Sequence, residues 1–106
     1  MENLDKEEIN MPVTLEKLAK ELEIPKNELL TLGFIAYLEH ELRLAEEDVA
    51  DFRDKYLVLN KEELEKHVKQ KSIPEHPAWE DLIAWENTEL YIQKVKNLFL
   101  KIKSIL

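Results

Sequence analysis

The chain has 106 residues, a formal net charge of −8 and no cysteine. This length suits one domain, and without cysteine neither disulfides nor thiolate chemistry is available. A single glycine and four prolines leave few places for tight turns, while the abundant Leu, Glu, Lys, Ile and Ala favour helix. No apolar run approaches the roughly 18 residues of a membrane span, and the acidic start lacks a signal-peptide pattern. We therefore expect a cytoplasmic, all-α protein that does not associate with membranes.

The negative charge is concentrated in the first half of the chain. Residues 1–57 hold 15 acidic and 7 basic side chains, whereas residues 58–106 hold 8 of each. The acidic half is expected to repel DNA and to attract a basic partner. The alternative is a solvated acidic surface that only aids solubility.

The N-terminal part is predicted to hold a flexible segment and one short helix. Residues 1–8 are expected to be flexible. Apolar and polar residues alternate over residues 9–13, which makes one short strand an alternative there, and Pro12 limits such a strand to a sheet edge. Thr14 is a suitable N-cap, and the apolar spacing after it predicts a helix over residues 15–23.

A long helix is predicted next, from about residue 26 to residue 57, after Pro25. Its apolar side chains recur at alternating spacings of three and four residues. This heptad pattern is typical of a helix packed along another long helix, as in a coiled coil. The seam positions, as we call these recurring apolar sites, are Ile35, Leu38, Leu42, Ala45, Val49, Phe52 and Tyr56.

A third helix and a proline-rich connection follow. Asn60 and Glu63 form a capping-box pattern, which predicts a helix over residues 61–71. Two prolines within residues 72–77 disfavour helix in the residues before them, so we expect an elbow in this segment.

The last helix is predicted to cover residues 78–105 and to carry a second seam. Its seam positions are Trp85, Thr88, Ile92, Val95, Phe99, Ile102 and Leu106. The simplest arrangement pairs the two long helices in an antiparallel, elongated hairpin or bundle, with the two shorter helices attached, as a single domain over residues 9–106. Each seam also offers apolar surface to a second chain, so a homo-oligomer is expected, with a dimer favoured.

The sequence contains no recognisable catalytic or metal-binding pattern. It lacks a glycine-rich phosphate loop, and its three histidines do not have the spacing of metal ligands. We predict a non-enzymatic protein with no cofactor and no metal. The most distinctive segment follows the elbow, where Trp79, Leu82, Ile83 and Trp85 form a broad apolar surface. Tryptophan is enriched at binding hot spots, so these residues are candidates for partner binding, and a core role is the alternative for both tryptophans.

The segment Leu-Ala-Lys-Glu-Leu-Glu-Ile-Pro-Lys-Asn-Glu-Leu-Leu at residues 18–30, continued by Phe-Ile-Ala-Tyr-Leu-Glu, carries a family resemblance. Residues 9–38 resemble the ribbon-helix-helix antitoxins of type II toxin–antitoxin modules. In that family a strand of a dimer enters the DNA major groove, and the C-terminal extension wraps the cognate toxin. The resemblance implies an antitoxin-like protein that binds and neutralises a basic toxin.

Two other functions remain as alternatives to the antitoxin. The first is a DNA-binding transcriptional regulator of the helix-turn-helix or ribbon-helix-helix type, built on residues 9–38. The second is a self-associating structural helical protein with no specific ligand.

Overall fold

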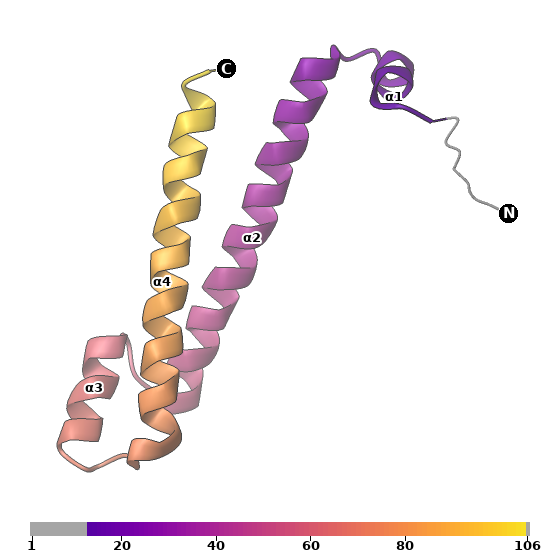
Figure 1. Cartoon of the computed structure of the whole chain (residues 1–106). Coiled ribbons are helices and arrows are strands. Elements are labelled where there is room, and N and C mark those ends of the chain that lie inside the picture. The colour runs from indigo at the N-terminus through magenta and orange to yellow at the C-terminus, as the bar shows by residue number, and fades with distance from the viewer. Residues whose placement is uncertain (1–12, 106) are drawn as a thin grey trace, which may run out of the picture. The chain divides into compact units, whose positions relative to one another are not determined.

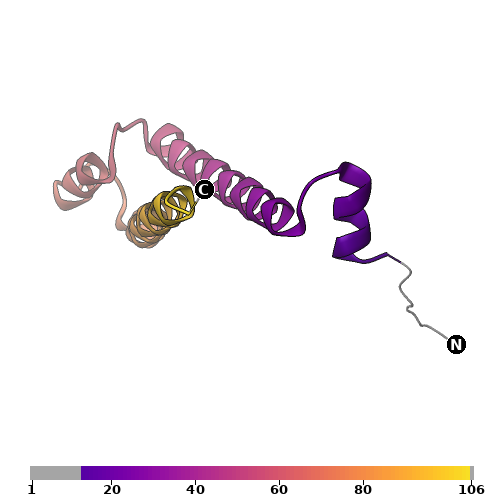
Figure 2. The same cartoon turned by 90° about the horizontal axis from the view of Figure 1, so that it is seen from above.

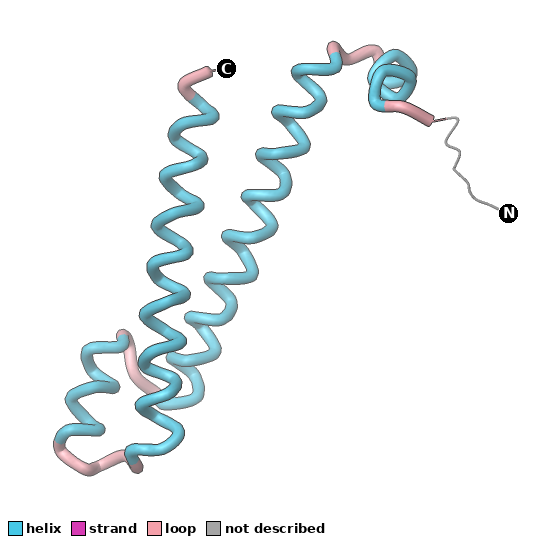
Figure 3. The backbone as a smooth tube through the Cα atoms, in the orientation of Figure 1, coloured by secondary structure: helices cyan, strands magenta, loops and turns pink. Residues whose placement is uncertain are grey.

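Residues 13–105 are described by a computed structural model, and every regular element in this range is a helix (Figure 1). The all-α prediction is therefore confirmed for these residues. Figure 3 shows only helices and loops along the described chain. The predicted flexible segment and most of the alternative strand, residues 1–12, lie outside the described residues, as does Leu106. Val13, the one described residue of that strand, lies in a loop.

The described chain forms four helices of very different length. They are α1 (Leu15–Leu22), α2 (Lys26–Tyr56), α3 (Lys61–Lys69) and α4 (Glu75–Lys103). The chain divides into two compact units within α2, and we call residues 1–36 the N-terminal unit and residues 37–106 the C-terminal unit. The prediction of one domain over residues 9–106 stays a prediction.

In the N-terminal unit, local capping fixes both ends of α1. The Thr14 hydroxyl oxygen accepts a hydrogen bond from the backbone N–H of Lys17 at 3.2 Å, as the sequence predicts for an N-cap. The helix ends at Leu22, and the next residue, Glu23, turns the chain with a left-handed φ of 61°. An exposed ion pair of 2.8 Å joins Lys26, at the start of α2, to Glu16 of α1. Local hydrogen bonds and charge therefore define this helix–turn–helix segment.

The C-terminal unit is built around an apolar core that α2, α3 and α4 share. Phe52 of α2 and Trp85 of α4 stack with ring centroids 5.5 Å apart. Leu64 of α3 is fully buried in the same core. The buried members of this core are Val49, Val58, Leu64, Val68, Ala78, Leu82 and Trp85.

Polar contacts join α4 to the part of α2 in the same unit. Asp81 accepts hydrogen bonds from Lys55, at 2.7 Å, and from the Tyr56 hydroxyl. Further along, the Tyr91 hydroxyl donates to Glu41 at 2.5 Å. Figure 2 shows α4 beside this part of α2, in agreement with these contacts. All predicted seam positions of both long helices that the structure describes are buried or half-buried.

The connection from α3 to α4 differs in detail from the sequence prediction. Asn60 caps α3, since its side-chain oxygen accepts from the Glu63 N–H at 2.8 Å, as predicted. However, α3 ends at Lys69, two residues before the predicted end, and α4 begins at Glu75 instead of residue 78. His76 and Pro77 interrupt the first turn of α4 with non-helical backbone angles, and the bond between them is cis. The predicted elbow thus corresponds to a turn followed by a kink.

Candidate protein-binding surfaces

The four predicted partner-binding residues do not share one exposed surface. Trp85 is 0% exposed and Leu82 is buried, so both belong to the core of the C-terminal unit. For Trp85 this placement matches the alternative of a core role, and the burial of Leu82 was not predicted. Trp79 is half-buried against the same core, whereas Ile83 is 63% exposed. Only Ile83 and part of Trp79 are accessible to a partner, and their role in binding stays a prediction.

Trp79 lies between two small hollows on the α3–α4 side of the unit. One, of about 150 Å³, is lined by Lys61, Glu65, Trp79, Leu82, Ile83 and Glu86. The other, of about 420 Å³, is lined by Val68, Lys69, Lys71, Ile73, Pro74, Glu75 and Trp79. Ligand pockets usually span roughly 300–1,000 Å³ and enclose most of their ligand. The first hollow lies below this volume range and the second lies within it.

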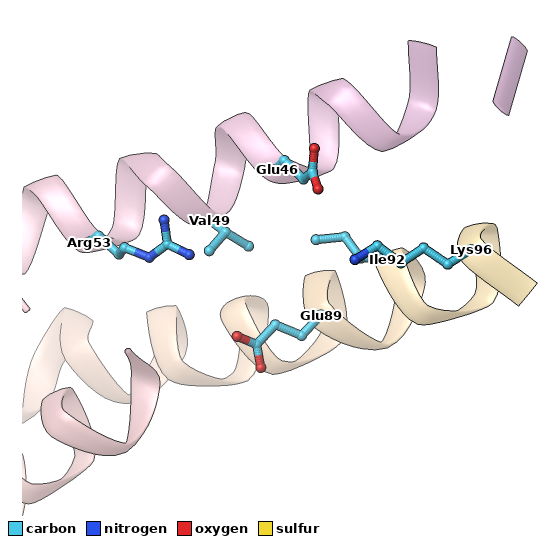
Figure 4. Close-up of a pocket in the computed structure, with 6 residues that line it drawn as sticks. All are labelled: Glu46, Val49, Arg53, Glu89, Ile92 and Lys96. Carbon is cyan, nitrogen blue, oxygen red and sulfur yellow. The ribbon is translucent and has the colours of Figure 1, made fainter. Parts of the chain in front are cut away.

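A groove of about 350 Å³ runs between α2 and α4 on one side of the C-terminal unit. Val49 and Ile92 line its centre. Its other lining residues are Glu46 and Arg53 of α2 and Glu89 and Lys96 of α4, and Figure 4 labels all six side chains on the two helices. The groove therefore has a small apolar centre and a charged rim of both signs.

The opposite side of the same helix pair is acidic. A shallow hollow there includes Glu41, Asp48 and Tyr91 among its lining residues, without a basic side chain. The hydrogen bond from Tyr91 to Glu41 raises the pKa of the Tyr91 hydroxyl to about 12, because the neutral phenol is the form that donates. The two sides of the helix pair therefore differ in charge pattern.

The N-terminal unit exposes a continuous apolar face on α1. Leu15, Leu18 and Leu22 recur at spacings of three and four residues, and we call this set the α1 leucine face. All three are exposed, Leu22 to 58%, and Ala19 is the buried side chain of this helix. Several apolar residues outside α1 in this unit are also exposed, namely Val13, Leu30, Leu32 and Phe34.

Sequence reasoning did not anticipate the exposure of the α2–α3 connection. Leu57 and Leu59 are exposed to 88% and 80%, on either side of the buried Val58. Leu57 was predicted to be the last helical residue, but it has a left-handed φ of 55° just beyond α2. The sequence contains no signal for this alternating exposure. Residues 57–59 are all apolar, so their pattern does not predict which side chain is buried.

The described residues include no group of three or more His, Asp or Glu side chains placed to hold a metal ion. None of the described helices has the length and apolarity needed to cross a membrane.

A sequence comparison places these features in a family. The profile of the uncharacterized protein MJ0235 family matches residues 11–104. The chain belongs to this family. No curated protein and no solved structure matches the sequence significantly. Because membership in the MJ0235 family assigns no activity, a functional proposal must rest on the surfaces described above.

Proposed function

We propose that this MJ0235-family chain is a non-enzymatic protein-interaction module that binds another protein through the α1 leucine face. The exposure of that face is the observation that supports the proposal. Isolated helices shorter than about 12–15 residues are marginal in water, and helices usually depend on burying an apolar face. The eight residues of α1 expose Leu15, Leu18 and Leu22 instead. A bound protein would cover these three leucines and so stabilise the helix.

The partner we propose is a basic protein with an apolar patch. Residues 1–57 carry the whole net charge of −8, which favours approach of a positively charged surface. The resemblance to ribbon-helix-helix antitoxins gives the specific form of this proposal, in which the chain neutralises a basic toxin. DNA is a weaker candidate, because residues 13–36 carry four acidic and three basic side chains and so offer no net positive charge.

The antiparallel hairpin of the two long helices is part of this proposal. Two contacts within the C-terminal unit support it, the Tyr91–Glu41 hydrogen bond and the Phe52–Trp85 stack. The first contact joins Glu41 of α2 to the later α4 residue, Tyr91. The second joins Phe52, which is later in α2, to Trp85, which is earlier in α4. The acidic residues of α2 would themselves attract a basic partner.

The test is co-expression with the product of a neighbouring reading frame that encodes a small basic protein, followed by affinity purification and a binding measurement. We expect wild type to bind, and Leu22→Glu to lower the affinity at least about tenfold, as for loss of an interfacial anchor. Lys20→Gln is the matched control, because it makes the same change in net charge on an exposed position of the same helix.

The control variant should bind like wild type. Glutamate is a good helix former, so Leu22→Glu should leave α1 helical in the free chain, which circular dichroism can verify. Equal affinities for wild type and Leu22→Glu would contradict the proposed surface. Failure of every basic neighbour to bind the wild-type chain would contradict the antitoxin form of the proposal.

A further inference from the structure

The groove between α2 and α4 carries four charges that alternate in sign. Along α2, Glu46 is followed two helical turns later by Arg53, and along α4, Glu89 is followed by Lys96 at the same spacing. The contacts of the C-terminal unit run in opposite chain order along the two helices. Glu46 therefore lies toward the Lys96 end of the groove and Arg53 toward the Glu89 end (Figure 4). We call this arrangement the charge quartet.

Within residues 13–105, the four charges of the quartet form no short ion pairs. Among the described residues, none of its four side chains has an oppositely charged partner within 4.0 Å. Other charged side chains of the unit do form such pairs, for example Lys55 with Asp81 at 2.7 Å. Glu89 accepts a hydrogen bond from the Trp85 indole N–H at 3.1 Å, which holds its carboxylate at the rim of the groove. The groove between the charges has room for groups from outside the chain.

We propose that this face binds a second copy of the chain through a two-fold axis. A two-fold interface brings the same patch of both copies together, so the patch must be complementary to itself. A half-turn about an axis across the helices places Glu46 of one copy opposite Arg53 of the other. A half-turn about an axis along the helices places Glu46 opposite Lys96. An acid meets a base in both cases, with Val49 and Ile92 at the centre.

The charge pattern favours a second copy over the other occupants of such a groove. A basic protein, the partner proposed for the α1 leucine face, would meet Arg53 and Lys96 as well as the two acids, so the neutral quartet gives it no net attraction. The opposite side of the helix pair has Glu41 and Asp48 without a base among its lining residues, and two copies would repel each other there. The quartet side is thus the self-complementary one.

This inference concerns a different surface from the proposed function and can be tested on the purified full-length chain alone. Sedimentation equilibrium should show a wild-type dimer at low salt that dissociates as salt is added, because exposed charges are screened. Arg53→Glu should weaken self-association at least about tenfold, since it places like charges opposite each other. Lys66→Glu is the control, because it makes the same charge change at an exposed position of α3, and it should leave the dimer intact.

Inverting the whole quartet provides the decisive variant, with Glu46→Arg, Arg53→Glu, Glu89→Lys and Lys96→Glu combined. The inverted pattern is again self-complementary, so the dimer should return, and it should not mix with wild type. Circular dichroism and tryptophan fluorescence check the fold of each variant. If the inverted chain does not fold, the salt dependence of the wild-type dimer decides. A monomeric wild type, a dimer that strengthens with salt, or equal effects of Arg53→Glu and Lys66→Glu would overturn the proposal.

Discussion

The two units of the chain use the same kind of amphipathic pattern with different results. In the C-terminal unit, Trp85, Leu64 and Val95 are almost fully removed from solvent. In α1, the same three- and four-residue spacing leaves Leu15, Leu18 and Leu22 exposed. The difference lies in the neighbours, because three helices contribute side chains to the core around Trp85. An apolar stripe predicts that a helix needs a partner surface, and only the tertiary structure shows whether the chain supplies it.

This contrast has a consequence for stability. Hydrophobic burial is the main favourable term in folding, so the C-terminal unit should supply most of the cooperative stability of the chain. The N-terminal unit should open at lower cost, as segments with few buried apolar contacts do. Both tryptophans, Trp79 and Trp85, lie in the C-terminal unit, so their fluorescence reports on that unit alone. Circular dichroism reports on the helices of both.

The largest expected effect comes from removing the centre of the core. Trp85→Ala should lower the free energy of unfolding by about 3–5 kcal/mol, because a fully buried ring stacked on Phe52 leaves a cavity. Urea unfolding followed by circular dichroism measures the change. Ile83→Ala, two positions earlier on α4 and 63% exposed, is the control and should stay within about 0.5 kcal/mol of wild type. Similar losses in the two variants would contradict the assignment of Trp85 to the core.

An intermediate effect is expected from Asp81, which joins α4 to α2. Its burial raises the pKa of the carboxyl, but the hydrogen bonds from Lys55 and Tyr56 outweigh this and hold the pKa below its usual value of 3.8. The resulting stabilisation is present above that usual value and is lost as the pH falls through the lowered pKa. Asp81→Asn should therefore destabilise the chain by about 1–2 kcal/mol at neutral pH. The difference from wild type should shrink on acidification below about pH 4.

The matched change in the N-terminal unit is Glu16→Gln, which breaks the ion pair with Lys26. The pKa of Glu16 is also lowered, chiefly by its hydrogen bond with Lys26, but both side chains are exposed. Surface ion pairs contribute little. Unfolding followed by tryptophan fluorescence should be the same for Glu16→Gln and wild type at every pH. For the Asp81→Asn variant, a loss of unfolding free energy that did not change with pH would show that the charge of Asp81 is not the stabilising feature.

Short-range features of the fold could be read from the sequence, because they depend on neighbouring residues. Thr14 and Asn60 cap helices as predicted, and the seam spacing placed Trp85 on the buried side of α4. The burial of Leu82, which lies off the seam, could not be read in this way. It follows from the packing of α3 on α4, a contact between separate helices that no spacing within one helix encodes.

The candidate surfaces were predictable to a smaller extent. The sequence identified the apolar segment around Trp79 and Ile83, but not which of its members the core would take. The charge quartet was present in the heptad frame, since each of its residues follows a seam position by the same offset. Recognising it requires the antiparallel pairing of α4 with the same part of α2 that we propose, which the Tyr91–Glu41 hydrogen bond and the Phe52–Trp85 stack support.

A small stabilising effect is expected from a backbone feature that occurs in both units. Leu57 and Glu23 each follow a helix with a left-handed φ, of 55° and 61°, where glycine is the favoured residue. Leu57→Gly should raise the free energy of unfolding of the C-terminal unit by about 0.5–1 kcal/mol, because it relieves this strain and the exposed side chain gives up little burial. Tryptophan fluorescence in urea measures the shift.

Glu23→Gly makes the matched change at the end of α1. It should leave the fluorescence-detected transition unchanged and should instead slow hydrogen exchange of the α1 amides, because the N-terminal unit opens separately from the core around Trp85. If Glu23→Gly stabilised the fluorescence-detected transition as much as Leu57→Gly, the two units would unfold together. The exposed α1 leucine face would then belong to a cooperative structure, and the contrast between the units would be one of surface and not of stability.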